Sequence, residues 1–316
     1  MDKKPFFSVV IPLYNKEDYI EDTLKSVFAQ TFSDFEVIII NDGCTDKTMD
    51  IVHHFKDPRL KIFNQLNAGL SIARNNGIKK ATTDYIAFID GDDLWGSNHL
   101  QQLYDLIKLY PNKGLYSTGY TIQKSKKTSH RAQFNDLPKN FKGVVPNFFK
   151  HSLQHCVAWV GSICIPTKVL EEMDYFDPEI FSEQDTDLYI KMALNNYEFV
   201  LDDTSASAVH NKTMSNNLSN YKFKTKIPKL LFSYKASELE NHHLKKYMDS
   251  NRFSTIVFFK LSSNKELERQ LKKDIEVKNL TPLQRLVINS PDFLVKILFY
   301  LKDKLKLNPF VLFKQK

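Results

Sequence analysis

Four apolar runs divide the first third of the chain. They cover Phe6–Leu13, Phe35–Ile40, Leu60–Phe63 and Asp84–Ile89, and the second and fourth are almost continuously apolar. Unbroken runs of this kind are typical of strands that are buried on both faces of a sheet. We therefore predict four buried strands in this part of the chain.

The segments between these runs have apolar residues at helical spacing. These positions are Tyr19, Ile20, Leu24, Val27 and Phe28, then Met49, Ile51, Val52 and Phe55, then Ile72, Ala73 and Ile78. Strands that alternate with helices predict parallel pairing with right-handed crossovers, and in such sheets ligands bind at the carboxyl ends of the strands. The expected fold is α/β, with a mostly parallel, Rossmann-like sheet flanked by helices.

The pattern changes in the later part of the chain. Gln123–Lys150 is polar and rich in lysine, which predicts an excursion or hairpin before a strand resumes at Val160–Ile165. Apolar residues then recur three and four positions apart in Ile227–Leu239 and Pro282–Leu307, which predicts helices. We expect one domain over residues 1–220, with halves at about 1–122 and 123–220, and a helical, basic extension over 221–316.

Composition narrows the class of protein. At 316 residues and 42% hydrophobic, the chain can bury one sizeable core and still carry an extension. The formal net charge of +7 favours an anionic partner, but does not choose among nucleotide, nucleic acid and acidic lipid. Three cysteines without a metal-knuckle spacing fit a reducing compartment, so we expect a cytoplasmic protein.

No segment is predicted to be a signal peptide or to cross a membrane. The first apolar run is interrupted by Pro12 and followed by Asn15, which is unlike a leader or a spanning helix. Phe293–Leu301 is the most membrane-like stretch, but it is shorter than the roughly 20 apolar residues that a bilayer requires.

Three carboxylates follow the fourth apolar run within four positions, in Asp90-Gly91-Asp92-Asp93. Mg²⁺ and Mn²⁺ prefer oxygen ligands and are usually held by one or two carboxylates together with substrate phosphates. The cluster therefore predicts a divalent metal that bridges the protein and a diphosphate. The alternative is a solvated turn in which an aspartate caps the next helix.

Asp42 ends the second apolar run, just before Gly43. It either belongs to an ordinary strand-to-helix turn, in which Gly43 permits the tight bend, or accepts a base N–H from a bound nucleotide. Since Tyr14 follows the first run in the same way, we expect polar residues from three strand ends to meet on one rim.

Four motifs occur in a characteristic order. They are Ser8-Val9-Val10-Ile11-Pro12-Leu13-Tyr14-Asn15, Ile39-Ile40-Asn41-Asp42-Gly43, Asn67-Ala68-Gly69-Leu70-Ser71-Ile72-Ala73-Arg74-Asn75 and Phe88-Ile89-Asp90-Gly91-Asp92-Asp93. This order resembles the family 2 glycosyltransferases of the GT-A fold, strongly over about the first hundred residues and more weakly to about residue 210. The resemblance implies sugar transfer from a UDP-sugar to a hydroxyl acceptor, with Mn²⁺ or Mg²⁺ as cofactor.

The resemblance also implies roles for individual residues of the donor site. Pro12, Tyr14 and Asp42 would surround the uridine with Glu17 nearby, Asp90 would contact the ribose, Asp92 the metal, and Asp93 either of these. Arg74 lies in the stretch that closes over the nucleotide in similar enzymes, or is a surface residue paired with a helix carboxylate. His210 would be a metal or diphosphate ligand, although most lone histidines are structural.

The candidate catalytic base lies in Phe181-Ser182-Glu183-Gln184-Asp185-Thr186-Asp187-Leu188. This segment resembles the Glu-Asp pair of the family and aligns Asp185 with the residue that deprotonates the acceptor. The usual glutamate is Gln184 here, so Glu183 is the alternative base. Asp185 could instead be a helix N-cap or first-turn acid that the helix dipole favours.

The candidate residues also predict the type of reaction and the position of the acceptor site. One base without a second carboxylate nucleophile predicts a single displacement with inversion, which the resemblance also implies. Trp159, Gly161 and Ser162 are candidates for the wall of the acceptor site. Two alternatives are transfer onto a polyprenyl phosphate and a nucleotide-sugar-binding scaffold without catalysis.

The C-terminal stretch combines apolar and basic residues. The apolar residues are Phe293, Leu294, Ile297, Leu298, Leu301 and Leu305, and the basic ones are Lys296, Lys302, Lys304 and Lys306. This composition predicts either a helix on an anionic bilayer, which suits a lipid-linked acceptor, or a helix packed on the domain or on a second subunit. The resemblance implies synthesis of a bacterial surface glycan, such as lipopolysaccharide or capsule, in the cytoplasm or on the inner face of the plasma membrane.

Three other classes fit less well. No G-x-G-x-x-G follows the first strand, as a Rossmann dehydrogenase requires, and no glycine-rich basic loop is present for a nucleotidyltransferase. Aromatic and basic residues are not interleaved, and an acidic rim repels phosphate, so we expect no nucleic-acid partner.

Overall fold

The computed structural model describes residues 4–125, 128–211 and 226–304, and its contacts form two compact units. The first unit comprises residues 1–132, 138–146 and 157–214, and the second 133–137, 147–156 and 215–316. The predicted domain boundary at residue 220 lies outside the described residues. Two short segments of the predicted acceptor half, 133–137 and 147–156, group with the C-terminal helices instead.

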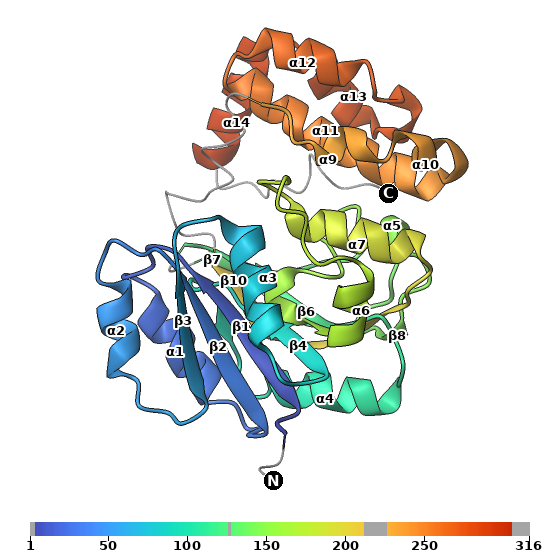
Figure 1. Cartoon of the computed structure of the whole chain (residues 1–316). Coiled ribbons are helices and arrows are strands. Elements are labelled where there is room, and N and C mark those ends of the chain that lie inside the picture. The colour runs from blue at the N-terminus through green and yellow to red at the C-terminus, as the bar shows by residue number, and fades with distance from the viewer. Residues whose placement is uncertain (1–3, 126–127, 212–225, 305–316) are drawn as a thin grey trace. The chain divides into compact units, whose positions relative to one another are not determined.

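A ten-stranded sheet forms the centre of the first unit (Figure 1). Its strands are β1 (Phe7–Leu13), β2 (Phe35–Asp42), β3 (Leu60–Gln65), β4 (Tyr85–Phe88), β5 (Leu94–Trp95), β6 (Leu115–Ser125), β7 (Thr128–Arg131), β8 (Lys142–Val144), β9 (Ile163–Pro166) and β10 (Phe199–Asn211). The main order is β3-β2-β1-β4-β9-β6-β10-β5, with β7 beside β6 and β8 beside β10. The four predicted strands are β1 to β4.

Helices cover this sheet. They are α1 (Ile20–Phe28), α2 (Thr48–His54), α3 (Leu70–Lys80), α4 (His99–Leu109), α6 (Thr167–Glu172), α7 (Gln184–Leu194) and the 3₁₀ turn η1 (Val160–Ser162). The first three match the predicted helical segments. Because η1 takes up Val160 to Ser162, the strand predicted at Val160–Ile165 begins only at Ile163.

Parallel pairing brings three strand ends to one edge. β1 lies between β2 and β4 and is parallel to both, with Leu13 opposite Asn41 and Val10 opposite Phe88. All of β1 and nearly all of β2 are buried, as their continuous apolar sequences predict. The residues that follow β1, β2 and β4 therefore share one rim, as predicted.

The second half of the sheet is mixed. β9 runs antiparallel between β4 and β6, β10 is parallel to β6, and β5 is antiparallel to β10. The predicted hairpin after Gln123 is present as β6 and β7. The expectation of a mostly parallel sheet thus holds for β1 to β4 and for the β6–β10 pair.

The second unit is helical. Its elements are α5 (Phe148–His151), α9 (Leu230–Ser233), α10 (Lys235–Glu240), α11 (His242–Leu261), α12 (Lys265–Lys272), the 3₁₀ turn η2 (Val277–Asn279), α13 (Pro282–Asn289) and α14 (Asp292–Lys304). α11 is its long central helix and contacts each of the others. The helical stretch predicted at Pro282–Leu307 is divided at Ser290 and Pro291, since proline lacks the N–H that a helix interior requires.

A buried ion network holds the second unit together. The Arg252 guanidinium lies 2.6 Å from a Glu238 oxygen and 3.1 Å from Asp249, and donates to the Leu231 carbonyl at 2.7 Å. These contacts tie α11 to α9 and α10. Loss of one charged partner would leave the others buried and uncompensated, which costs several kcal/mol in typical proteins.

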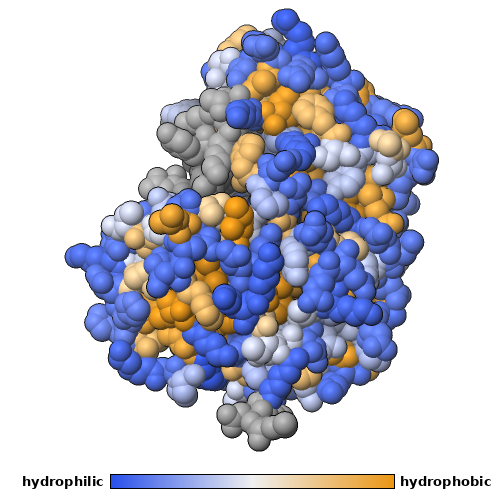
Figure 2. Space-filling view, in the orientation of Figure 1, coloured by the Kyte–Doolittle hydropathy of each residue, from blue (hydrophilic) through white to orange (hydrophobic). Residues whose placement is uncertain are grey.

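Across the described ranges of the chain, every helix is too short or too polar to span a bilayer. Figure 2 shows that hydrophilic residues cover most of the visible face, with apolar patches among the C-terminal helices. In α14 the exposed apolar residues are Phe293, Leu294, Ile297, Leu298, Tyr300 and Leu301.

Candidate active site

A buried arginine connects the predicted donor and base residues. Arg74 of α3 is 1% exposed, and its Nη2 donates to Asp90 Oδ1 at 2.7 Å. Burial alone would lower the pKa of Arg74, but the charges of Asp90 and Asp185 outweigh that effect and raise it. The alternative of a surface arginine is therefore wrong: the guanidinium lies between carboxylates from two distant parts of the sequence.

Arg74 has further hydrogen-bond donors besides the Nη2 that binds Asp90. Its Nε and Nη1 are buried and have no hydrogen-bond partner in the described part of the chain. Its guanidinium lies 5.3 Å from the centre of the Phe176 ring, which fixes its plane. Buried unsatisfied donors are rare in folded proteins and are typical of sites that bind a ligand or an ordered water.

The carboxylate turn is positioned by strands at both ends. β4 ends at Phe88 and β5 begins at Leu94, and the Asp93 N–H closes the turn on the Asp90 carbonyl at 3.1 Å. Asp92 pairs with Lys16 at 2.8 Å, a residue of the β1 rim that the sequence analysis does not single out. Lys16 partly neutralises the turn.

Asp93 is the buried acid of this turn. It is 2% exposed and accepts the Asn211 N–H at 2.8 Å. Burial, then the charges of Asp92 and Asp90, raise the pKa of Asp93 well above its ordinary value, despite opposing effects of Asn211 and Lys16. The turn therefore carries more negative charge than its protein neighbours compensate, which is the environment that a cation stabilises.

His210 reaches this turn because β5 pairs with β10. Val209 lies opposite Leu94, directly after the carboxylates, so that His210 Nδ1 comes within 3.3 Å of Asp93 Oδ1. A metal-bound imidazole commonly has this second contact with a carboxylate through its other nitrogen.

Protein side chains alone form no metal cage in the part of the chain that the structure describes. Within residues 4–125, 128–211 and 226–304, no three His, Cys, Asp or Glu side chains are grouped closely enough to hold an ion. Magnesium usually takes one or two carboxylates and completes its shell with water and substrate phosphates. The donor set of Asp92 and His210 beside Asp93 fits that mode of binding and not a closed structural site.

The β2 end forms a rigid loop around Asp42. Its carboxylate is 4% exposed and accepts the N–H groups of Ala68 at 2.8 Å and Gly69 at 3.0 Å, and the Gln65 amide at 2.8 Å. Asp42 thereby fixes the loop that leads into α3 and Arg74. It is a structural anchor as well as a candidate nucleotide contact.

The β1 end supplies the remaining rim residues. Pro12 is buried, whereas the Tyr14 side chain is 46% exposed and open to a ligand. Glu17 is exposed and its carboxylate accepts the Lys47 N–H at 2.9 Å, which caps the start of α2.

The candidate base lies at the start of α7. Gln184 is the first helical residue, Glu183 is its N-cap with a left-handed φ of 62°, and Asp185 is in the first turn. Burial raises the pKa of Asp185, and Arg74 opposes this rise. Burial and the Asp185 charge raise the pKa of Glu183 to about 7.

Hydrogen bonds from α3 bring this segment to the rim. The Asn75 side chain donates to the Phe176 carbonyl at 2.8 Å and accepts its N–H at 3.0 Å. The Ser71 hydroxyl lies 3.4 Å from the Ile180 carbonyl. The sequence contains no local signal for these contacts.

Trp159 packs against two aromatic side chains, one of which is His210. Its ring centre is 4.7 Å from that of His210 and 5.0 Å from that of Tyr120. Ser162 is fully buried, and a Cβ on Gly161 would lie 2.4 Å from the Trp159 indole, so both residues support the ring from behind. Trp95 is core: its indole N–H donates to the Gly161 carbonyl at 2.7 Å.

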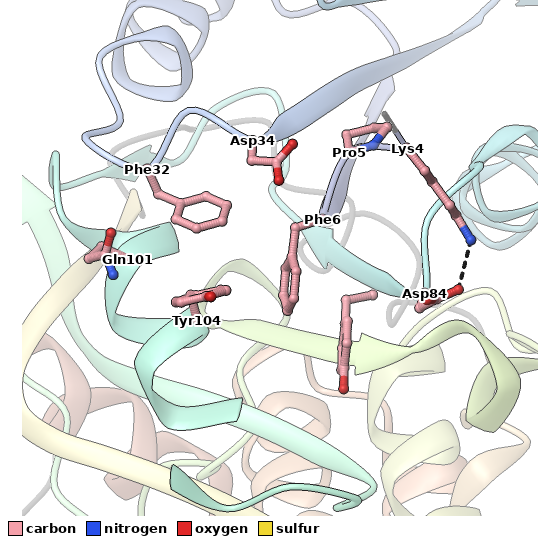
Figure 3. Close-up of a pocket in the computed structure, with 9 residues that line it drawn as sticks. Lys4, Pro5, Phe6, Phe32, Asp34, Asp84, Gln101 and Tyr104 are labelled. Atoms are coloured by element: carbon pink, nitrogen blue, oxygen red, sulfur yellow. Dashed lines mark hydrogen bonds and ion pairs between the residues drawn. The ribbon is translucent and has the colours of Figure 1, made fainter. Parts of the chain in front are cut away.

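A separate hollow of about 570 Å³ lies at the opposite, amino-terminal edge of the sheet (Figure 3). Phe6, Asp34 and Asp84, which directly precede β1, β2 and β4, line it, and Lys4 pairs with Asp84 at 2.7 Å. It contains none of the predicted site residues, so the rim at the carboxyl ends remains the candidate site.

Comparison with protein families gives a match to "Glycosyl transferase family 2" over residues 8–177, more than half of the chain. The chain belongs to this family. The family prediction is therefore confirmed, and with it the assignment to glycosyltransferases. The matched region contains the whole donor rim and ends before Asp185 and His210.

Individual relatives match over shorter ranges. The chain is 44% identical over 101 residues to the uncharacterized glycosyltransferase EpsJ of Bacillus subtilis. The matched residues make up 31% of this chain and 29% of EpsJ. The chain is 36% identical over 122 residues to the putative teichuronic acid biosynthesis glycosyltransferase TuaG of the same organism, 38% of this chain and 48% of that one. The matches thus span less than half the length of either relative.

Solved structures share the fold over nearly the whole chain. S. aureus TarS 1-349 in complex with UDP-GlcNAc aligns with TM-score 0.62 at 19% identity, covering 94% of this chain and 92% of that one. The mannosyltransferase PcManGT of Pyrobaculum calidifontis, in complex with GDP-Man and Mn²⁺, aligns with TM-score 0.56 at 15% identity, covering 98% and 82%. The predicted α/β fold of the GT-A type is confirmed.

The raised pKa of Glu183 predicts a pH dependence of stability. The unfolded chain releases this proton near pH 4.5 and the folded chain near pH 7, so the free energy of unfolding falls between these values as pH rises. Glu183→Gln has no such proton, and should gain stability over wild type from pH 5 to pH 8 by up to about 3 kcal/mol. Urea unfolding at several pH values measures this difference.

Glu171→Gln is the matched control, because Glu171 is exposed on α6. Its difference from wild type should stay constant over the same pH range. Parallel stability curves for Glu183→Gln and wild type would contradict the burial of this acid.

Proposed function

We propose that this member of family 2 is an inverting, metal-dependent glycosyltransferase that moves a sugar from a UDP-sugar to a hydroxyl of a glycan or lipid-linked acceptor. The observation that carries the proposal is Arg74, whose buried guanidinium interacts with Asp90 of the carboxylate turn and with Asp185 of α7. Donor and acceptor chemistry require these two groups at one centre.

The donor nucleotide is assigned to the rim at the ends of β1 and β2. The exposed Tyr14 ring beside Pro12 offers a stacking surface, and Asp42 offers a carboxylate for a base N–H. Glu17 lies at the outer side of the same rim. UDP-GlcNAc in TarS supports a uridine nucleotide, while GDP-Man in PcManGT leaves the base to be tested.

The leaving diphosphate is assigned to the carboxylate turn. Asp92 and His210 would hold the Mn²⁺ or Mg²⁺ ion, with Asp93 orienting His210 and Asp90 directed at the ribose. When bound, such an ion neutralises charge that develops on the departing diphosphate. Lys16 and the unsatisfied donors of Arg74 supply further positive charge on the protein side.

Deprotonation of the acceptor hydroxyl is assigned to Asp185. Burial raises the pKa of this carboxylate, which makes it a stronger proton acceptor, and the Arg74 guanidinium stabilises its ionised form. Trp159 would form the acceptor wall, held in place by Gly161 and Ser162. A single base and no second carboxylate nucleophile correspond to inversion at the anomeric carbon.

The biological setting is proposed from the relatives. The name of TuaG refers to teichuronic acid biosynthesis, which supports a role in the synthesis of a cell-surface polysaccharide, including capsule or lipopolysaccharide. We place the enzyme in the cytoplasm, or on the inner face of the plasma membrane if α14 contacts lipid.

A donor screen tests the proposed activity. A panel of UDP- and GDP-sugars with Mn²⁺, Mg²⁺ or EDTA should give one donor that raises Tm and is slowly hydrolysed only with metal, because binding to the folded state stabilises it. Asp92→Ala should lose this response, whereas Asp105→Ala, on exposed α4 surface, should keep it. A panel without any metal-dependent response would contradict the donor site.

Asp185→Asn tests the base. We expect kcat to fall by roughly 10²- to 10⁴-fold with donor binding intact, because the amide cannot accept the proton and no donor contact is removed. Turnover with an acceptor and calorimetry with the donor separate the two effects, and Asp105→Asn is the isosteric control. Unchanged turnover would transfer the role of base to Glu183.

Membrane contact is proposed for the apolar face of α14. Phe293, Ile297 and Leu301 are 61%, 50% and 45% exposed, so their joint replacement by glutamine should reduce flotation with phosphatidylserine vesicles and leave the fold intact. The control replaces Leu66 and Leu239, which lie outside α14 and are even more exposed, by glutamine. Equal flotation of both variants would contradict the contact.

A further inference from the structure

A small pocket lies entirely within the second unit. It has a volume of about 100 Å³ and is lined by Asn135, Asp136, Lys150, Leu153, His242, His243 and Lys246. The lining comes from segment 133–137, from α5 and the residues after it, and from the first turn of α11. These are the short segments that leave the first unit to pack on the C-terminal helices.

The lining is strongly cationic. It contains two lysines and two histidines, and its single acid, Asp136, lies 3.4 Å from Lys150 with both side chains about half exposed. Burial lowers the pKa of His243, and the positive charges of His242, Lys150, Lys246 and His151 lower it further. The electrostatic potential at this pocket is therefore positive.

The direction of α11 adds to this charge. The 20-residue helix begins at His242, so its positive dipole end and its first N–H groups lie at the pocket, and its first turn contains no acidic residue. Asn241 caps only the Leu244 N–H, at 3.0 Å. Glu276 faces His242 from outside the lining and is itself paired with Lys278 at 2.8 Å.

Cations at the amino end of a helix destabilise a protein unless an anion compensates them. Asp136 compensates Lys150, and Glu276 is paired with Lys278, so among the described residues Lys246, His242 and His243 have no ion pair with an acid and are difficult to explain by stability. Lysine ammonium groups and helix N–H groups are the usual ligands of phosphate.

We propose that this pocket binds a single phosphate group, as a monoester or diester carried by the acceptor. The inference rests on the proposed function, because it makes the second unit an anchor for the acceptor. A volume of about 100 Å³ admits a phosphate and excludes a nucleotide, whose pockets measure roughly 300 Å³ or more. A lipid-linked sugar and a phosphodiester-containing glycan present the same chemistry to the pocket.

Calorimetry on the full chain tests the site with sodium phosphate, glycerol 3-phosphate and glycerophosphoglycerol. Lys150→Ala/Lys246→Ala should weaken binding at least roughly tenfold, because two charge-assisted contacts are lost. Arg269→Ala/Lys273→Ala removes the same charge from exposed positions of the same unit and should bind as wild type does. In wild type, saturation with phosphate should raise the pKa of His243, which NMR of labelled histidines measures.

Further experiments distinguish a lipid headgroup from a soluble glycan, and the phosphate pocket from the proposed glycosyltransferase activity. Binding to phosphatidylcholine vesicles that contain undecaprenyl phosphate identifies a lipid headgroup, and binding to glycerophosphoglycerol alone identifies a soluble glycan. The lysine pair variant should keep the metal-dependent donor response of wild type. No saturable phosphate binding, or equal weakening in both lysine variants, would overturn the pocket, whereas a failed donor screen would overturn only the proposed activity.

Discussion

The candidate active site depends on one buried charge. Arg74 is enclosed at the carboxyl edge of the sheet, where burial of a guanidinium is costly unless carboxylates surround it. Asp90 and Asp185 meet that requirement, and they come from the end of β4 and the start of α7. The same electrostatic constraint therefore brings the end of β4, where the donor is proposed to bind, close to the start of α7, where the acceptor is proposed to bind.

Helix α3 positions the two sides of the candidate site through hydrogen bonds as well as through the charge of Arg74. Its N-terminal loop is held by Asp42, which accepts the N–H groups of Ala68 and Gly69. Nearly two turns further on, Asn75 bonds both backbone groups of Phe176 and so attaches the segment that leads to α7. A rigid element thus joins the nucleotide rim to the candidate base, which is how precise geometry is maintained in catalytic sites.

The sequence predicts the donor half of the site well, because its signals are local. A continuous apolar run followed by a polar residue gives the ends of β1, β2 and β4, and parallel pairing brings them together. The partners of Arg74 could not be predicted in this way, since Asp185 is distant in sequence and no periodicity links it to α3. The contact of Lys16 with Asp92 has no sequence signature either, because a lone lysine after a strand is common. The helical extension over 221–316 is predicted as a whole, but the bounds of α11 are not, because its buried face includes charged residues such as Asp249 and Arg252.

Burial raises the pKa of two acids of the site, Asp93 and Asp185, but the charges beside the two acids differ. Asp93 is buried against Asp92 and Asp90 with only Lys16 and a backbone N–H to offset them, so its pKa is raised and the turn favours a cation. Burial also raises the pKa of Asp185, whose side chain is partly exposed, but there the charge of the Arg74 guanidinium opposes the rise. The carboxylate turn therefore favours a cation, as the proposed diphosphate site requires, whereas Asp185 has a cationic neighbour that stabilises its ionised form, as the proposed base requires.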